Sequence, residues 1–164
     1  MDVFHVDKKT YGWIFAGLSV AFIGLSQFNG LLLRRYSSQQ IIRVALSGQV
    51  VVSLVFLIGS IAGWYGLGYT IVMLFAFLAC LGFTNPNAAA LSLAPFSKNA
   101  GSASALLGAT QMGVGALASV GVSVFNNGTE TPMVAIIAVT SVLALGVLVV
   151  GFRATGRRGL QGSI

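Results

Sequence analysis

Six side chains with different chemical groups recur at intervals of three and four residues in the middle of the chain. They carry hydroxyl, thioether, aromatic, thiol and amide groups: Thr70, Met73, Phe77, Cys80, Thr84 and Asn87. These intervals place them along one side of an α-helix. Such a stripe could line a pathway for amphipathic ligands, with Met73 and Phe77 accepting varied apolar groups. It could equally be ordinary packing between helices, and both interpretations stay open.

A proline and two glutamines mark further positions of interest. Pro86, between Asn85 and Asn87, removes a backbone donor and disfavours helix at the preceding residue, so a kink is expected there. Kinked helices are common in the moving or substrate-facing parts of transporters. Gln27 and Gln111 lie in apolar runs, where an amide needs a polar partner on another helix or on a substrate.

Small residues form rows in two apolar runs. The later run carries two such rows at helical spacing, namely Gly101, Ser104, Gly108, Gln111, Gly115 and Ala118, and Gly101, Ala105, Ala109 and Gly113. The first run has a similar row of Gly12, Ala16, Ser19, Ile23, Ser26 and Gly30. Small residues let helices approach closely in lipid, so both helices are predicted to pack tightly, against either this chain or a partner.

The apolar runs lack the side chains that most enzymes use for catalysis. The single histidine is His5, near the terminus, and no carboxylate lies within an apolar run. The single cysteine, Cys80, allows no internal disulfide and no Cys/His cluster for a metal. No basic stripe with interleaved aromatics indicates nucleic-acid binding. We therefore expect no enzyme activity, no cofactor, no metal and no nucleic-acid partner.

The elements that carry these residues are predicted to be membrane helices. Charged residues make up 7% of the chain and mean hydropathy is +0.91, whereas soluble domains carry about 25% charge. Five charge-poor stretches approach or exceed the roughly 20 residues that span a bilayer as a helix, namely 11–33, 41–63, 67 to about 90, 100–125 and 132–152. The fold class is thus all-α and polytopic, with an external segment 1–10, a five-helix domain 11–152 and a basic tail 153–164. The second and fifth stretches are featureless and are expected to face lipid.

Positive charge predicts the orientation of these helices. Alternating the connections across the membrane gathers seven cations on one side: Arg34, Arg35, Arg43, Lys98, Arg153, Arg157 and Arg158. Only Lys8 and Lys9 fall on the other side. Because cytoplasmic loops are rich in Lys and Arg, the C-terminus is predicted to be cytoplasmic and the N-terminus external, in the plasma (inner) membrane. An exported N-terminus without a signal peptide suggests that a preceding span is missing.

Two segments resemble the Bcr/CflA drug-efflux subfamily of the major facilitator superfamily. Residues 85–108 are similar to the connection between its tenth and eleventh helices, with the Pro-Asn-Ala and Ala-Gly-Ser-Ala-Ser-Ala elements at 86–88 and 100–105. Residues 29–36 resemble the end of its eighth helix and the following basic loop, without the Asp and Gly of the superfamily's loop signature. The resemblance covers essentially the whole chain, which aligns with helices eight to twelve of a transporter that has twelve helices.

The resemblance implies part of a drug transporter that works by alternating access and proton antiport. It places Met73, Phe77, Thr84 and Asn87 on the route of small hydrophobic drugs, with Gln27 and Gln111 at the boundary with the missing half. The first and fourth helices would face that half, and the second and fifth would be peripheral. The chain alone is expected to be inactive. The alternative is a nontransporting membrane subunit or truncated product that binds a partner; a pore is disfavoured because no polar rings are visible.

Overall fold

The computed structural model describes residues 7–64, 66–125 and 129–161, and every regular element in these ranges is helical. A short 3₁₀-helix, η1 (Ala94–Asn99), joins the third and fourth of the α-helices. The α-helices are α1 (Lys8–Leu32), α2 (Ser38–Ile61), α3 (Leu67–Leu93), α4 (Ala100–Val124) and α5 (Thr131–Gln161). The predicted external segment and basic tail fall partly outside the described residues, at 1–6 and 162–164.

Four helical segments of the described chain are long and apolar enough to cross a membrane. They are Gly12–Leu32, Ser38–Ile61, Leu67–Val124 and Thr131–Arg153. The third is 58 residues long because it runs through α3, η1 and α4 without a break. The prediction of an all-helical chain with several helices able to span a membrane is therefore confirmed for the described residues.

Local sequence explains where several helices begin. Ser37 caps α2, since its hydroxyl accepts a hydrogen bond from the backbone N–H of Gln40, and the Gln40 side chain accepts one from the Ser37 backbone N–H. This reciprocal pair satisfies donors that the first turn leaves free. Gly63 has a φ of 80° just beyond α2, a conformation that costs glycine little. Helix α5 begins at Thr131, one residue before the predicted start at Pro132.

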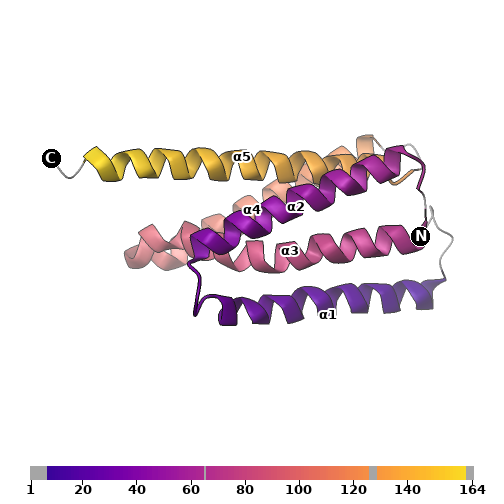
Figure 1. Ribbon diagram of the computed structural model, residues 1–164, viewed down its shortest axis with the longest axis horizontal. Coiled ribbons are helices and arrows are strands. Elements are labelled where there is room, and N and C mark those ends of the chain that lie inside the picture. The colour runs from indigo at the N-terminus through magenta and orange to yellow at the C-terminus, as the bar shows by residue number, and fades with distance from the viewer. Residues whose placement is uncertain (1–6, 65, 126–128, 162–164) are drawn as a thin grey trace.

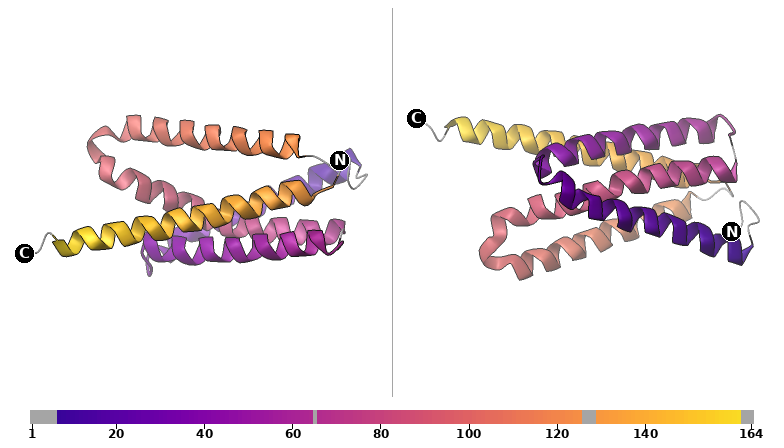
Figure 2. Two further views of the ribbon diagram at one scale, coloured as in Figure 1. Left: turned by 90° about the horizontal axis from the view of Figure 1, so that it is seen from above. Right: turned by 60° about the horizontal axis from the view of Figure 1, so that its bottom comes forward.

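The segment Ala94–Asn99 forms η1 and reverses the chain between α3 and α4. Phe96 leaves the helical region, with φ −107° and ψ 31°, and Pro95 follows the first residue of the 3₁₀-helix. As a result α4 runs back beside the end of α3 as the second arm of a hairpin, which Figure 2 shows in its left view.

Helices α1, α2, α3 and α5 form the packed part of the molecule (Figure 1). Helix α3 packs against α1 and α2, and α2 also packs against α5. Arg34, Arg35, Arg43, Lys98 and Arg153 lie at the end of the bundle that holds the α1–α2 connection and η1, which we call the basic end. The opposite end, which holds Glu130, is called the Glu130 end.

Helix α2 supplies most of the buried side chains, so the expectation that it faces lipid is wrong. Its buried residues form a continuous set of Ile41, Ile42, Leu46, Gln49, Ser53, Phe56, Gly59 and Ser60. Several are small or polar, and they meet α3 on one side and α5 on the other. The opposite face of α2, with Val44, Val51 and Ile58, is exposed. An apolar run does not reveal which side is covered by protein, because lipid and protein interior favour the same residues.

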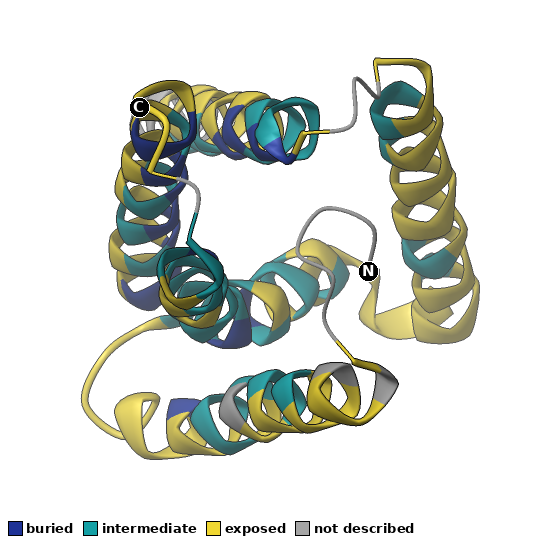
Figure 3. Ribbon diagram, turned by 90° about the vertical axis from the view of Figure 1, so that its right-hand side faces the viewer, coloured by how far each residue is buried: buried dark blue, intermediate teal, exposed yellow. Residues whose placement is uncertain are grey.

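Helix α4 stands apart from the packed helices. None of its residues is buried, and Figure 3 shows it as an almost wholly exposed rod to the side of the bundle. Three of its large apolar side chains, Leu106, Met112 and Leu117, are each more than two-thirds exposed.

Candidate functional site

Polar side chains join the packed helices in pairs along the bundle. Near the basic end, Asn87 of α3 donates from Nδ2 to Asn29 Oδ1 of α1 at 2.7 Å and to the backbone oxygen of Phe83 at 2.8 Å. Asn87 is 1% exposed and Asn29 is 5% exposed. Asn87 Oδ1 is buried and has no hydrogen-bond partner among the described residues. This amide pair holds α1 and α3 at a fixed register.

We expect Asn87→Leu to lower the free energy of unfolding by about 1.5 kcal/mol, because Asn29 then stays buried without its donor. Unfolding by SDS titration in mixed micelles measures the change. Gln111→Leu is the matched control, since Gln111 is exposed and should change stability by no more than about 0.5 kcal/mol. Equal effects of both substitutions would contradict the role given to the amide pair.

A second polar contact lies between α2 and α3. The Thr84 hydroxyl lies 3.2 Å from Gln49 Oε1 and 2.9 Å from the backbone oxygen of Cys80. Its single hydrogen is shared between these acceptors. Gln49 is buried and was missed in the sequence, although it is an amide in an apolar run, the same signal that singled out Gln27 and Gln111.

A third group, which we call the Glu130 cluster, closes the opposite end of the bundle. Thr70 of α3 donates from Oγ1 to Glu130 Oε2 at 2.9 Å, and the hydroxyls of Ser60 and Thr131 lie 3.0 Å apart. Glu130 is 5% exposed, and its Oε1 has no hydrogen-bond partner among the described residues. The cluster thus links α2, α3 and the start of α5.

Glu130 is buried although it is a charged residue that lies between α4 and α5 in the sequence. Its backbone oxygen accepts a hydrogen bond from the Val134 N–H at 3.1 Å, so Glu130 sits at the N-terminal boundary of α5. An acidic residue is favourable there because the helix dipole is positive at its N-terminus. A signal was available in the sequence: Glu130 directly precedes Thr131 and Pro132, the start of a helix.

The predicted pathway residues share α3 but differ in their surroundings. Met73, Phe77 and Thr84 are half-buried, whereas Asn87 is buried in its contact with α1. Two of them are therefore tied to neighbouring helices by hydrogen bonds, Thr84 to α2 and Asn87 to α1. Thr84 and Asn87 therefore take part in packing between helices. A role in a ligand pathway stays a prediction for Met73 and Phe77.

Gln27 and Gln111 are both exposed. Neither side chain has a hydrogen bond within the described part of the chain. Their predicted polar contact at a boundary between halves therefore stays a prediction.

The glycines of the small-residue rows have free space around them. A Cβ added at Gly30, Gly101, Gly108, Gly113 or Gly115 would meet no atom within 4 Å beyond its own helix. Ser104 is exposed and Ser26 is half-buried. The close approach of α1 and α3 occurs instead at Gly82, where an added Cβ would lie 3.1 Å from the Phe22 carbonyl oxygen. Ser26, a member of the α1 row, lies at this contact, with its backbone nitrogen 3.4 Å from the added Cβ. The α4 rows remain candidates for a partner outside the described chain.

Pro86 lies inside α3, and the helix continues past it to Leu93. The helix also extends beyond the predicted end near Ala90. Pro86 therefore does not end α3, and the reversal of the chain comes at η1.

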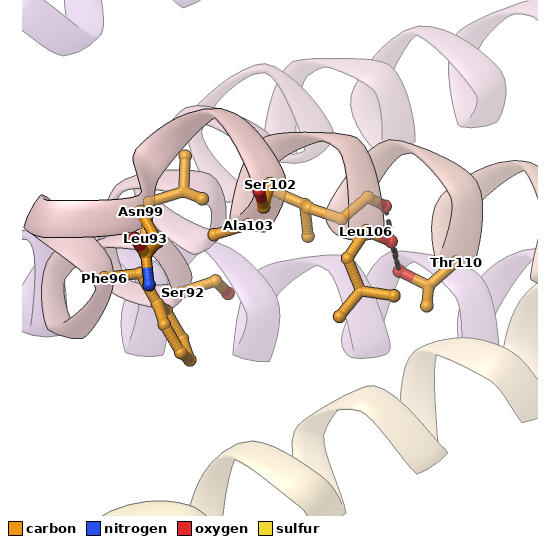
Figure 4. Close-up of a pocket in the computed structure, with 9 residues that line it drawn as sticks. Ser92, Leu93, Phe96, Asn99, Ser102, Ala103, Leu106 and Thr110 are labelled. Carbon is orange, nitrogen blue, oxygen red and sulfur yellow. Dashed lines mark hydrogen bonds between the residues drawn. The ribbon is translucent and has the colours of Figure 1, made fainter.

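An open groove lies between the end of α3, η1 and α4 (Figure 4). Its volume is about 440 Å³, within the range of drug-sized ligand sites. The lining mixes apolar and hydroxyl or amide side chains: Ser92, Leu93, Phe96, Asn99, Ser102, Ala103, Leu106, Leu107 and Thr110. Thr110 Oγ1 lies 2.9 Å from the backbone oxygens of Leu106 and Leu107, so its hydroxyl is already bonded within α4. None of the predicted pathway residues lines this groove.

Comparisons with protein-family models, with curated proteins and with solved structures find no match to this chain.

Proposed function

We propose that this chain is the C-terminal part of a Bcr/CflA-type drug-efflux transporter of the major facilitator superfamily. The whole transporter would export small hydrophobic compounds across the plasma membrane by proton antiport and alternating access. The observation that carries the proposal is the state of α4: it is apolar and rich in small residues, yet none of its residues is buried. A complementary bundle docked on α4 would supply the packing that such rows favour in lipid.

The proposal includes five membrane crossings rather than four. Helices α3 and α4 have 27 and 25 residues, each enough for one crossing, and η1 reverses the chain between them. With five crossings all the cations of the basic end face one side, which the positive-inside rule makes cytoplasmic. The C-terminus is then cytoplasmic.

Substrate would meet α3 and α4 along their mixed apolar and polar surfaces. Met73 and Phe77 are half-buried on α3, and the groove beside η1 offers hydroxyl groups next to Leu93, Phe96 and Leu106. Flexible and aromatic side chains adapt to varied apolar ligands. Under this proposal no catalytic step is involved, and the proton-carrying carboxylates of antiport would belong to the N-terminal part of the transporter.

Coexpression with an N-terminal seven-helix portion of a Bcr/CflA transporter tests the proposal. Cells with both parts are expected to accumulate less ethidium than cells with either part alone. Met73→Ala with Phe77→Ala should reverse most of this decrease, while Val142→Ala on the exposed face of α5 should leave it in place. Unchanged ethidium accumulation with folded, coexpressed parts would contradict the proposal.

The uncovered face of α4 also favours a second candidate, a nontransporting membrane subunit that binds a partner. Both candidates predict that Gly113→Val weakens association with the partner. No atom of this chain lies within 4 Å of a Cβ added at Gly113, so the valine side chain would project into the space that the partner helix occupies. They differ in export: the subunit would bind the supplied portion without lowering ethidium accumulation.

A further inference from the structure

A pocket lies between α2 and α5 at the basic end of the bundle. Its volume is about 400 Å³. The polar part of the lining comes from Arg43 and Ser47 of α2 and Arg153 of α5. The apolar part comes from α5, chiefly Leu145, Leu148 and Phe152. Two cationic groups on two different helices therefore face one partly apolar cavity.

The arginine on α2 is positioned by an aromatic ring. Arg43 Cζ lies 4.4 Å from the centroid of the Phe152 ring, a cation–π distance that joins the two helices. Stacking uses the face of the guanidinium group and leaves the N–H donors at its edge for another acceptor. Both arginines are exposed, so their donors are open to a ligand from outside the chain.

Among the residues that the structure describes, the chain offers no side-chain carboxylate to neutralise this pair. Its acidic residues are Asp2, Asp7 and Glu130, and none lies between residues 8 and 129 or after 130. Glu130 and Asp7 belong to the opposite end of the bundle, beside the start of α5 and the start of α1. Neither Arg43 nor Arg153 has an ion pair within the described residues. An anion from outside the described residues can therefore balance these charges.

We propose that this pocket binds an anionic phospholipid, with the headgroup phosphate between Arg43 and Arg153 and an acyl chain along Leu145 and Leu148. Guanidinium groups bind phosphate oxygens through pairs of hydrogen bonds, and the Ser47 hydroxyl adds a donor. The apolar wall favours a lipid over a soluble phosphate, because only a ligand with a hydrocarbon chain can make van der Waals contacts with the leucine side chains. A neighbouring apolar pocket that shares Leu148 and Phe152 extends this wall toward α3.

The position along the helices agrees with a lipid headgroup. Arg43 lies in the second turn of α2. Arg153 is the last residue of the apolar part of α5 that could span a membrane, Thr131–Arg153. Basic pockets between membrane helices at this depth suit anionic lipid headgroups. The inference needs only that the helices lie in a bilayer, and it holds for either function proposed above.

Lipid titration of the purified full chain tests the site. Nanodiscs of phosphatidylcholine with increasing phosphatidylglycerol are used, and bound phosphatidylglycerol is counted by native mass spectrometry. We expect preferential retention of phosphatidylglycerol, reduced about tenfold in Arg43→Gln with Arg153→Gln. Phe152→Leu should reduce it about threefold through loss of the cation–π contact.

The matched control is Arg34→Gln with Arg35→Gln, which removes the same charge from the α1–α2 connection outside this pocket. It should change retention less than twofold. An equal loss in control and pocket variants would overturn the site in favour of diffuse attraction to basic residues. Displacement of the lipid by millimolar inorganic phosphate would also overturn it, because the pocket would then bind a soluble anion.

Discussion

Gly82→Val is expected to lower the free energy of unfolding by about 3 kcal/mol. A Cβ at this position would lie 3.1 Å from the backbone oxygen of Phe22 and 3.4 Å from the backbone nitrogen of Ser26. Backbone atoms cannot turn aside as side chains do, so α1 must move away from α3. SDS titration in mixed micelles measures the loss.

Two further variants show whether the loss comes from helix contact. Gly82→Ala should cost about 1 kcal/mol, because it adds only the crowded Cβ. Gly146→Val should change stability by less than about 0.5 kcal/mol, because no atom lies within 4 Å of the position of its Cβ. If Gly146→Val were as damaging as Gly82→Val, the close approach of α1 and α3 would not explain the effect.

Thr70→Val is expected to lower the free energy of unfolding by about 2 kcal/mol. Valine has nearly the shape of threonine but lacks the hydroxyl that donates to Glu130 Oε2 at 2.9 Å. Since Glu130 Oε1 already has no partner among the described residues, the substitution leaves a buried carboxyl group without its donor. The same micelle titration reports this change.

Thr70→Ser restores the hydroxyl and should recover most of the stability lost in Thr70→Val. The pair of variants separates the hydrogen bond from the methyl group. If Thr70→Ser were as unstable as Thr70→Val, packing of the methyl group would matter more than the contact with Glu130, and the Glu130 cluster would lose its stabilising role.

The starts of the helices could be predicted closely from the sequence because charge and apolar length set them, whereas α5 continues to Gln161, past its predicted end at residue 152. Helix α2 begins three residues before the predicted start, at a capping box that the sequence contains, and α4 begins at the predicted residue. Helix α3 extends three residues past its expected end near residue 90, through a proline expected to disturb it. Membrane helices satisfy their own backbone hydrogen bonds, so their lengths follow mainly from local composition.

The arrangement of the helices could not be predicted in the same way. The valine-rich α2 was expected to face lipid, but it packs against α3 and α5. The packing predicted for the glycine rows of α4 stays a prediction for a partner, and the close contact within the chain lies at Gly82, outside those rows. Lipid and protein interior are equally apolar, so hydrophobic pattern alone does not distinguish a covered face from an uncovered one.

The polar contacts were partly visible in the sequence. Thr70, Thr84 and Asn87 belong to the predicted stripe, and each makes a hydrogen bond to another helix or to Glu130. Their partners Asn29, Gln49 and Glu130 come from distant parts of the chain. Pairing of this kind depends on the three-dimensional register of the helices, which a single sequence does not specify.

In the proposed topology, the chain crosses the membrane five times with its basic end in the cytoplasm. Single cysteines at Ser37, Trp64, Ser97 and Thr129, in a Cys80→Ser background, test it by labelling intact cells with an impermeant maleimide. The account predicts labelling at positions 64 and 129 and protection at 37 and 97 until the cells are opened. Labelling of position 97 from outside, or of 37 and 64 from the same side, would contradict it.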